Sequence, residues 1–195
     1  MTTPEEVLSF WIDEVGPGRW YRADPALDAR VRERFGALWE TAASGGIGHW
    51  LCNPQSALAL VIVLDQFPRN IFRGEARAFA TDSAARAAAK RAVVLGWDMR
   101  VAEPERQFFY LPLMHSECLC DQDRGVRLFL TRMPLSGEDN LAHARAHRAE
   151  IRRFGRFPHR NLALGRTETD AERAYLATGG YGRTLREMEA ARLSA

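Results

Sequence analysis

The sequence predicts an all-α protein, built as a tetratricopeptide-like superhelix of antiparallel helix pairs with about seven to nine helices. Apolar residues recur every three or four positions in several segments, and no segment shows the alternation typical of a strand. Capping residues, prolines and glycines punctuate the chain at short intervals. No clean repeat of about 34 residues is present, so helix length and short loops alone favour the superhelix. A chain of 195 residues is expected to form one domain, 1–195.

A capping residue followed by proline marks the start of each of the first three predicted helices. These starts are Thr3-Pro4, Asp24-Pro25 and Asn53-Pro54. The third helix is apolar on every side from Ala57 to Leu64, so we expect it to be fully buried. Pro68 should break or kink it.

Weaker signals mark the remaining helices. Thr81-Asp82 should cap a fourth, alanine-rich helix. A long fifth helix is expected from Glu103-Pro104 to about Met133, kinked at Pro112. Later helices are expected over 139–154, after the capping box Thr169-x-x-Glu172, and over 183–193.

Composition narrows the class of protein. The net charge of +2 does not favour nucleic-acid binding, and no apolar run reaches the ~18 residues of a membrane span. The first ten residues do not resemble a signal peptide. The three cysteines, Cys52, Cys118 and Cys120, are an odd number, which suits buried, reduced thiols. We therefore expect a cytoplasmic protein with neither a nucleic-acid nor a membrane partner.

The first of three polar clusters comprises Asp65, Gln66, Arg69 and Asn70. Asp65 follows the apolar stretch near the C-terminal end of a buried helix, where it loses solvation and faces the negative end of the helix dipole. It therefore needs a cation nearby. An Asp–Arg tie between two helices and a ligand site remain equally open readings.

The second polar cluster comprises His115, Glu117 and Gln122. Along the expected fifth helix, His115 and Gln122 share a face with apolar residues, which predicts that both point inward. A histidine in that position is more often a satisfied core group than a catalyst.

The third polar cluster begins on the helix expected over 139–154. His147 lies on its apolar stripe, and His143, His147 and Glu150 have a spacing that could offer a metal two or three ligands. The helix lacks the glutamate that follows the first histidine in metalloproteases. No metal and no cofactor are therefore expected.

The same cluster continues into a loop rich in arginine and aromatic residues, "RFGRFPHRNLALGR", over 153–166. Gly155 permits a left-handed turn, and Pro158 fixes the backbone. Phe154 and Phe157 can anchor the loop on the core. The anchored loop would present a preorganised set of donors: Arg156, His159, Arg160 and Asn161.

Four long segments resemble signature blocks of the family called Domain of Unknown Function 924. They are "LALVIVLDQFPRNIFRG", "AFATDSAA", "ERQFFYLPLMHSE" and "RFGRFPHRNLALGR". The resemblance runs from Val7 to about Leu176. It implies a tetratricopeptide-like all-α fold and no established reaction. Its recurring polar positions fall here on Asp65, Gln66, Arg69, Asn70, Asp82, His115, Glu117, Gln122, His147, Arg156, His159, Arg160, Asn161 and Arg166.

These observations favour an internal pocket that binds a small carboxylate or phosphate. Arg156 and Arg160 would clamp the anion, Asn161 and Gln66 would orient it, and Asp65 would hold an arginine. If a reaction follows, His147, His159 or His115 would act as acid or base, because histidine titrates near neutral pH.

Two alternatives stay open. A tetratricopeptide-like groove could capture a peptide C-terminus, or the charges could pair internally as a structural network. Whether the protein is an enzyme is undecided. The pocket requires the three polar clusters to meet in space.

Overall fold

A computed structural model describes residues 2–193, in which every regular element is a helix and none is a strand. The all-α fold class is thus confirmed. The chain divides into two compact units, one ending at Pro112 and the other beginning at Leu113. The single domain over 1–195 and the tetratricopeptide-like superhelix remain predictions.

The helices of the first unit begin where the capping residues and prolines predict. α1 starts with the Thr3–Glu6 capping box and continues without a break into a π-helical stretch. Pro68 separates α4 from α3, as its position in the sequence predicts. The longer elements of this unit are α1 (Pro4–Leu8), the π-helix Ser9–Val15, α2 (Pro25–Ala43), α3 (Pro54–Asp65), α4 (Phe67–Ile71) and α5 (Asp82–Val94). Shorter 3₁₀ turns cover Gly48–Trp50, Ala76–Phe79, Asp98–Arg100 and Glu105–Phe109.

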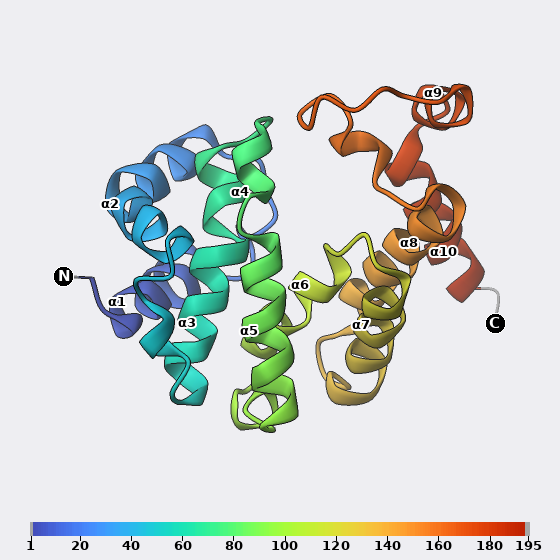
Figure 1. Ribbon diagram of the computed structural model, residues 1–195. Helices are drawn as coiled ribbons and strands as arrows, with labels where there is room; N and C mark the ends of the chain where they lie inside the picture. The colour runs from blue at the N-terminus through green and yellow to red at the C-terminus, as the bar shows by residue number, and fades with distance from the viewer. Residues whose placement is uncertain (1, 194–195) are drawn as a thin grey trace. The chain divides into compact units, whose positions relative to one another are not determined.

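Helix α3 forms the centre of the first unit, with α5 along its side (Figure 1). Every residue from Ala57 to Leu64 is buried, as the apolar run predicts. An aromatic group packs nearby, with ring centroids 4.8 Å apart for Phe35 and Phe67 and 5.6 Å apart for Trp11 and Phe67. The burial of these rings adds to the hydrophobic stabilisation of the unit.

The start of α5 departs from the expected cap. Thr81 occupies the N-cap position, but its side chain makes no capping hydrogen bond. Its hydroxyl instead donates to the carbonyl of Leu64 at 2.6 Å and accepts from the indole of Trp39 at 3.2 Å. A buried hydroxyl thus connects three elements of the first unit.

The second unit packs α7 against α8, and α10 against α8 (Figure 1). Its last helices match the expected ones closely, including the complete Thr169–Glu172 capping box at the start of α9. Helix α8 ends at Gly155, whose φ of 71° is left-handed. This unit begins at Leu113, within α6 (Leu111–Met114). Its other elements are α7 (Leu119–Arg132), α8 (Glu138–Phe154), the 3₁₀ turn Pro158–Arg160, α9 (Asp170–Ala177) and α10 (Gly180–Leu193).

The prediction of one long fifth helix is wrong. The chain forms a 3₁₀ turn, the short α6 and then α7, with a non-helical break between Met114 and Leu119. Gln122 donates to the carbonyls of Met114 at 2.6 Å and Ser116 at 2.7 Å, and the Ser116 hydroxyl accepts from the amide of Cys118 at 3.2 Å. These polar side chains satisfy the backbone groups that a continuous helix would pair internally.

The cysteine prediction is wrong in one respect. Cys52, Cys118 and Cys120 are free thiols, as expected, but all three are exposed rather than buried. Cys118 is the N-cap residue of α7 and Cys120 is the second residue of that helix, ahead of the buried Asp121 and Gln122.

Candidate functional site

The candidate site lies in the second unit, around the ring of Phe157. This ring is fully buried. Its centroid lies 5.2 Å from that of His147 and 5.5 Å from that of His159, and the Arg160 guanidinium carbon lies 4.6 Å away, over its face. We call the following residues the Phe157 cluster: His115, His147, Glu150, Phe157, His159 and Arg160.

The loop after α8 positions Arg160. Gly155 turns the chain out of α8, and the buried Phe157 and Pro158 then hold the loop against the unit. Arg160 is only 6% exposed, and its Nη2 donates to the carbonyl of His115 at 3.1 Å. The second and third predicted polar clusters therefore meet here.

His147 is held as a neutral imidazole with a defined tautomer. Its Nδ1 lies 2.9 Å from the carbonyl of His143, and because a carbonyl only accepts, Nδ1 carries the proton. Nε2 is then an acceptor. Burial, reinforced by His115, holds the pKa of His147 well below its usual range.

His159 is the most accessible member of the cluster, with 43% of its side chain exposed. Its Nδ1 lies 3.9 Å from Oε2 of Glu150. Partial burial, followed by the charge of Arg160, lowers the pKa of His159 to about 4. His115 and Arg166 act in the same direction, and Glu117 alone opposes them. Burial is thus the main cause of the lowered pKa, and the neighbouring cationic groups add to it.

Glu150 is a buried carboxyl group with one unused oxygen. Only 2% of the Glu150 residue is exposed. Oε1 accepts from the Tyr175 hydroxyl at 2.7 Å, and that hydroxyl also lies 2.9 Å from Oγ1 of Thr184. Oε2 has no hydrogen-bond partner among residues 2–193. Burial raises the pKa of Glu150 above its usual value.

From the sequence, Glu150 was considered only as a possible metal ligand, and Tyr175 and Tyr181 were not considered as site residues. The Tyr181 ring lies 4.6 Å from that of His147, and its hydroxyl contacts Nδ1 of His143. A signal for Glu150 was available, since residues three apart share a face of a helix and His147 was already predicted to point inward. Nothing in the sequence pattern indicates the two tyrosines.

Two other arginines of the loop already hold carboxylates. Arg166 makes a forked pair with Glu117, at 2.9 Å to Oε2, and donates to the carbonyl of Phe157 at 3.1 Å. Glu117 also accepts from the amide of Phe157 at 2.8 Å. Burial works to raise the pKa of Glu117, but these donors outweigh it and the pKa is lowered. The arrangement closes the loop on itself.

Arg156 makes the second fork. Its Nε and Nη2 donate to the two oxygens of Glu172 at 2.6 and 2.7 Å. The hydrogen bond from Arg156, together with the donors of Thr169, lowers the pKa of Glu172. Asn161 is fully buried, and its amide helps to lower that pKa although neither side-chain atom forms a well-oriented hydrogen bond. Gln122, as described above, closes the end of α6.

The first polar cluster belongs to the first unit. Asp65 is fully buried and accepts from Gln66 at 2.6 Å. Arg69 lies 3.4 Å from the Asp65 carboxylate and 2.9 Å from that of Asp82. This is the helix-to-helix tie that the sequence left as one of two readings.

The other member of that cluster, Asn70, donates to Asp28 at 2.7 Å. The convergence of Asp65, Gln66, Arg69 and Asn70 with the clusters of the second unit remains a prediction.

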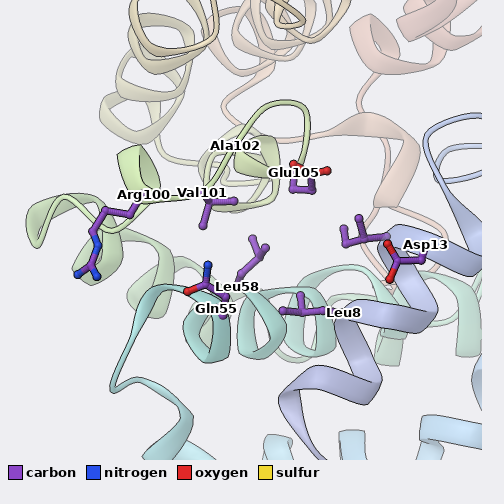
Figure 2. A pocket seen from close by; sticks show the side chains of 9 residues that line it. Leu8, Asp13, Gln55, Leu58, Arg100, Val101, Ala102 and Glu105 are labelled. Atoms are coloured by element: carbon purple, nitrogen blue, oxygen red, sulfur yellow. The ribbon is translucent and has the colours of Figure 1, made fainter.

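The first unit also contains a pocket of about 400 Å³ that no predicted site residue lines (Figure 2). Leu8, Leu58 and Val101 give it apolar walls, and the Asp13 and Glu105 carboxylates lie on one side of it.

A polar pocket of about 280 Å³ in the second unit borders Tyr175 and Thr184, the hydroxyl partners of Glu150. Arg153 and Arg183 also line it.

Neither a metal site nor a membrane span is found in the part of the chain that the structure describes. No three His, Cys, Asp or Glu side chains among residues 2–193 are grouped so that they could hold a metal ion. None of the helices in that range combines the length and apolar character that a membrane crossing requires.

Comparison with known proteins places the chain in a family. The model of the family described as "Bacterial protein of unknown function (DUF924)" matches residues 7–180. No curated protein matches the chain. A solved structure, described as a protein of unknown function, ATU0120, from Agrobacterium tumefaciens, is 43% identical, with a TM-score of 0.82 over 89% of this chain and 96% of that chain. The chain therefore belongs to the DUF924 family, as its four signature segments predict.

Proposed function

We propose that the second unit binds a small anion, a carboxylate or a phosphate, at the Phe157 cluster. The observation that carries this proposal is the position of Arg160. Its guanidinium is almost completely buried, over the Phe157 ring and at the carbonyl of His115. The charge of Arg160 adds to burial in lowering the pKa of His159, and a buried guanidinium favours an anion beside it.

Arg160 is the residue to which we assign the anion contact. Its side chain is already held over Phe157 and at the carbonyl of His115, so little conformational entropy is lost when a ligand binds. Arg156 and Arg166 are assigned to the structure, because each already forms a fork with a buried or half-buried carboxylate.

The cluster also supplies a group for acid–base chemistry. His147 is neutral, and Nε2 is its acceptor nitrogen; because its lowered pKa makes it a weak base, it could take a proton only from an acidic group of a bound ligand. His159 is suited to exchange protons with solvent, because its side chain is exposed. Catalysis is the second step of the proposal, and anion binding does not depend on it.

A peptide C-terminus would offer the same carboxylate. The loop offers no feature that selects a peptide over a free acid, and the tetratricopeptide-like groove that would hold a peptide remains a prediction. We therefore keep the small anion as the proposed ligand, in a cytoplasmic protein. A panel of C-terminal peptides tests the alternative.

The test measures the pKa of His159 by NMR in the presence of acetate and of phosphate. A bound anion within about 4–6 Å should raise that pKa by about 1–3 units. Chloride at matched ionic strength is the control, because screening alone would also change the pKa slightly.

In the variant Arg160→Gln, the anion should raise the pKa of His159 much less than in wild type. A His159 pKa that moves equally in acetate, phosphate and chloride would contradict the proposal, and so would an equal rise in Arg160→Gln.

A further inference from the structure

We infer that the ligand of the Phe157 cluster carries a hydrogen-bond donor, an ammonium or a hydroxyl group, close to its anionic group, and that Oε2 of Glu150 accepts from that donor. The ligand class is thus an amino acid or a hydroxy acid rather than a simple carboxylate. This inference rests on the proposed function, since it places the second half of the same ligand.

The first observation is the unused oxygen of Glu150. A carboxyl group that is 2% exposed ordinarily has both oxygens hydrogen-bonded, because an unsatisfied buried acceptor is costly. Tyr175 satisfies Oε1, whereas Oε2 has no partner among residues 2–193 and lies 3.9 Å from His159. The missing partner is a donor.

The second observation is the tautomer of His147. Nδ1 is used by the carbonyl of His143, so Nε2 is an acceptor. His147 and Glu150 are three residues apart on α8 and therefore share one face. Two acceptors on one face call for a ligand with donors.

The third observation is the charge around these acceptors. Arg160 is close enough to Glu150 to lower the pKa of that carboxyl group, in opposition to burial. An anionic group alone would approach the arginine and the Glu150 carboxyl together, and the two negative groups would repel each other. A donor on the ligand between them converts that repulsion into a hydrogen bond.

The experiment compares three acids with the same carbon skeleton: propionate, lactate and alanine. Binding is measured by calorimetry to the full chain and to the variant Glu150→Gln. This variant keeps an oxygen for Tyr175 and removes the charge from the other position. Asp170→Asn, at a residue whose side chain is 97% exposed, is the matched control for the loss of one negative charge in the same unit.

We expect alanine or lactate to bind wild type at least about tenfold more tightly than propionate, because a hydrogen bond to a charged group is involved. Glu150→Gln should remove most of that preference while propionate binding stays the same or improves. Asp170→Asn should keep the preference.

Each contrary outcome has a distinct meaning. If the three acids bind equally to wild type, the inference is overturned and the proposed anion site stands, with a water molecule as the partner of Glu150. If the preference survives in Glu150→Gln, another group receives the donor and the inference is again overturned. If none of the three acids binds, the inference fails, and the proposed function fails as well unless phosphate raises the pKa of His159.

Discussion

Replacing Arg69 tests whether the first polar cluster holds the fold. Arg69→Gln would leave the Asp65 carboxylate, which is 1% exposed, without the cation that lies 3.4 Å away. Breaking a buried pair by removing one partner costs about 3–5 kcal/mol. Gln66 still donates to Asp65, so we expect the lower end, about 3 kcal/mol. At a urea m-value of about 1–3 kcal/mol/M, the unfolding midpoint should fall by about 1 M or more.

Tryptophan fluorescence reports on the unfolding of the first unit. All five tryptophans, at positions 11, 20, 39, 50 and 97, belong to the first unit, as does Arg69. The emission change on unfolding therefore reports the unit that the substitution perturbs. Far-UV circular dichroism on the same samples follows the whole chain.

Arg73→Gln is the matched control. Arg73 lies four residues further on and pairs with Asp28 at 2.8 Å, but half of its side chain is exposed. Its loss should cost at most about 1 kcal/mol, because Asp28 keeps its bond from Asn70. Equal midpoint shifts for the two variants would refute the structural reading of the first cluster. The double variant Asp65→Asn/Arg69→Gln should recover part of the loss, since it removes the buried charge as well.

Two further predictions concern the loop after α8. His159 is neutral in the folded state down to about pH 4, whereas an ordinary histidine takes up a proton near 6.5. The unfolded state therefore binds more protons between these values, and stability falls as the pH falls through this window. His159→Gln should flatten that fall in urea midpoints taken across the window, and an unchanged slope would show that His159 keeps an ordinary pKa. Gly155→Ala should cost about 1–2 kcal/mol, because its φ of 71° is left-handed and no atom lies within 4 Å of the added Cβ. Gly36→Ala within α2 has equal space and a helical backbone, so it should be neutral or stabilising, and equal effects in both would contradict the backbone argument.

The fold was predictable wherever local chemistry decides it. The capping boxes at Thr3 and Thr169 form as expected, because their hydrogen bonds close within three residues. The fifth helix failed for the opposite reason. Helical spacing predicted one continuous element, but Gln122 reaches back to carbonyls six and eight residues earlier and stabilises a break. Periodicity alone does not reveal such a competitor.

The candidate site was predictable only in part. Crowded arginines and aromatic rings correctly indicated an ordered loop held by Phe157. The partners of those arginines were not readable, since Arg166 pairs with a residue 49 positions away and Arg156 with one 16 positions away. Those long-range pairs decide which arginine has a structural role and which could contact a ligand.

The closed loop formed by Glu117, Arg166 and Phe157 has a consequence for proteolysis. Proteases that cleave after arginine need an extended, accessible backbone, and loops rich in arginine usually provide it. Here the amide and the carbonyl of Phe157 are both bound, by Glu117 and Arg166, and the side chain of Arg160 is almost completely buried. The segment from Arg156 to Arg166 is thus a poor substrate for trypsin, although its composition suggests the reverse.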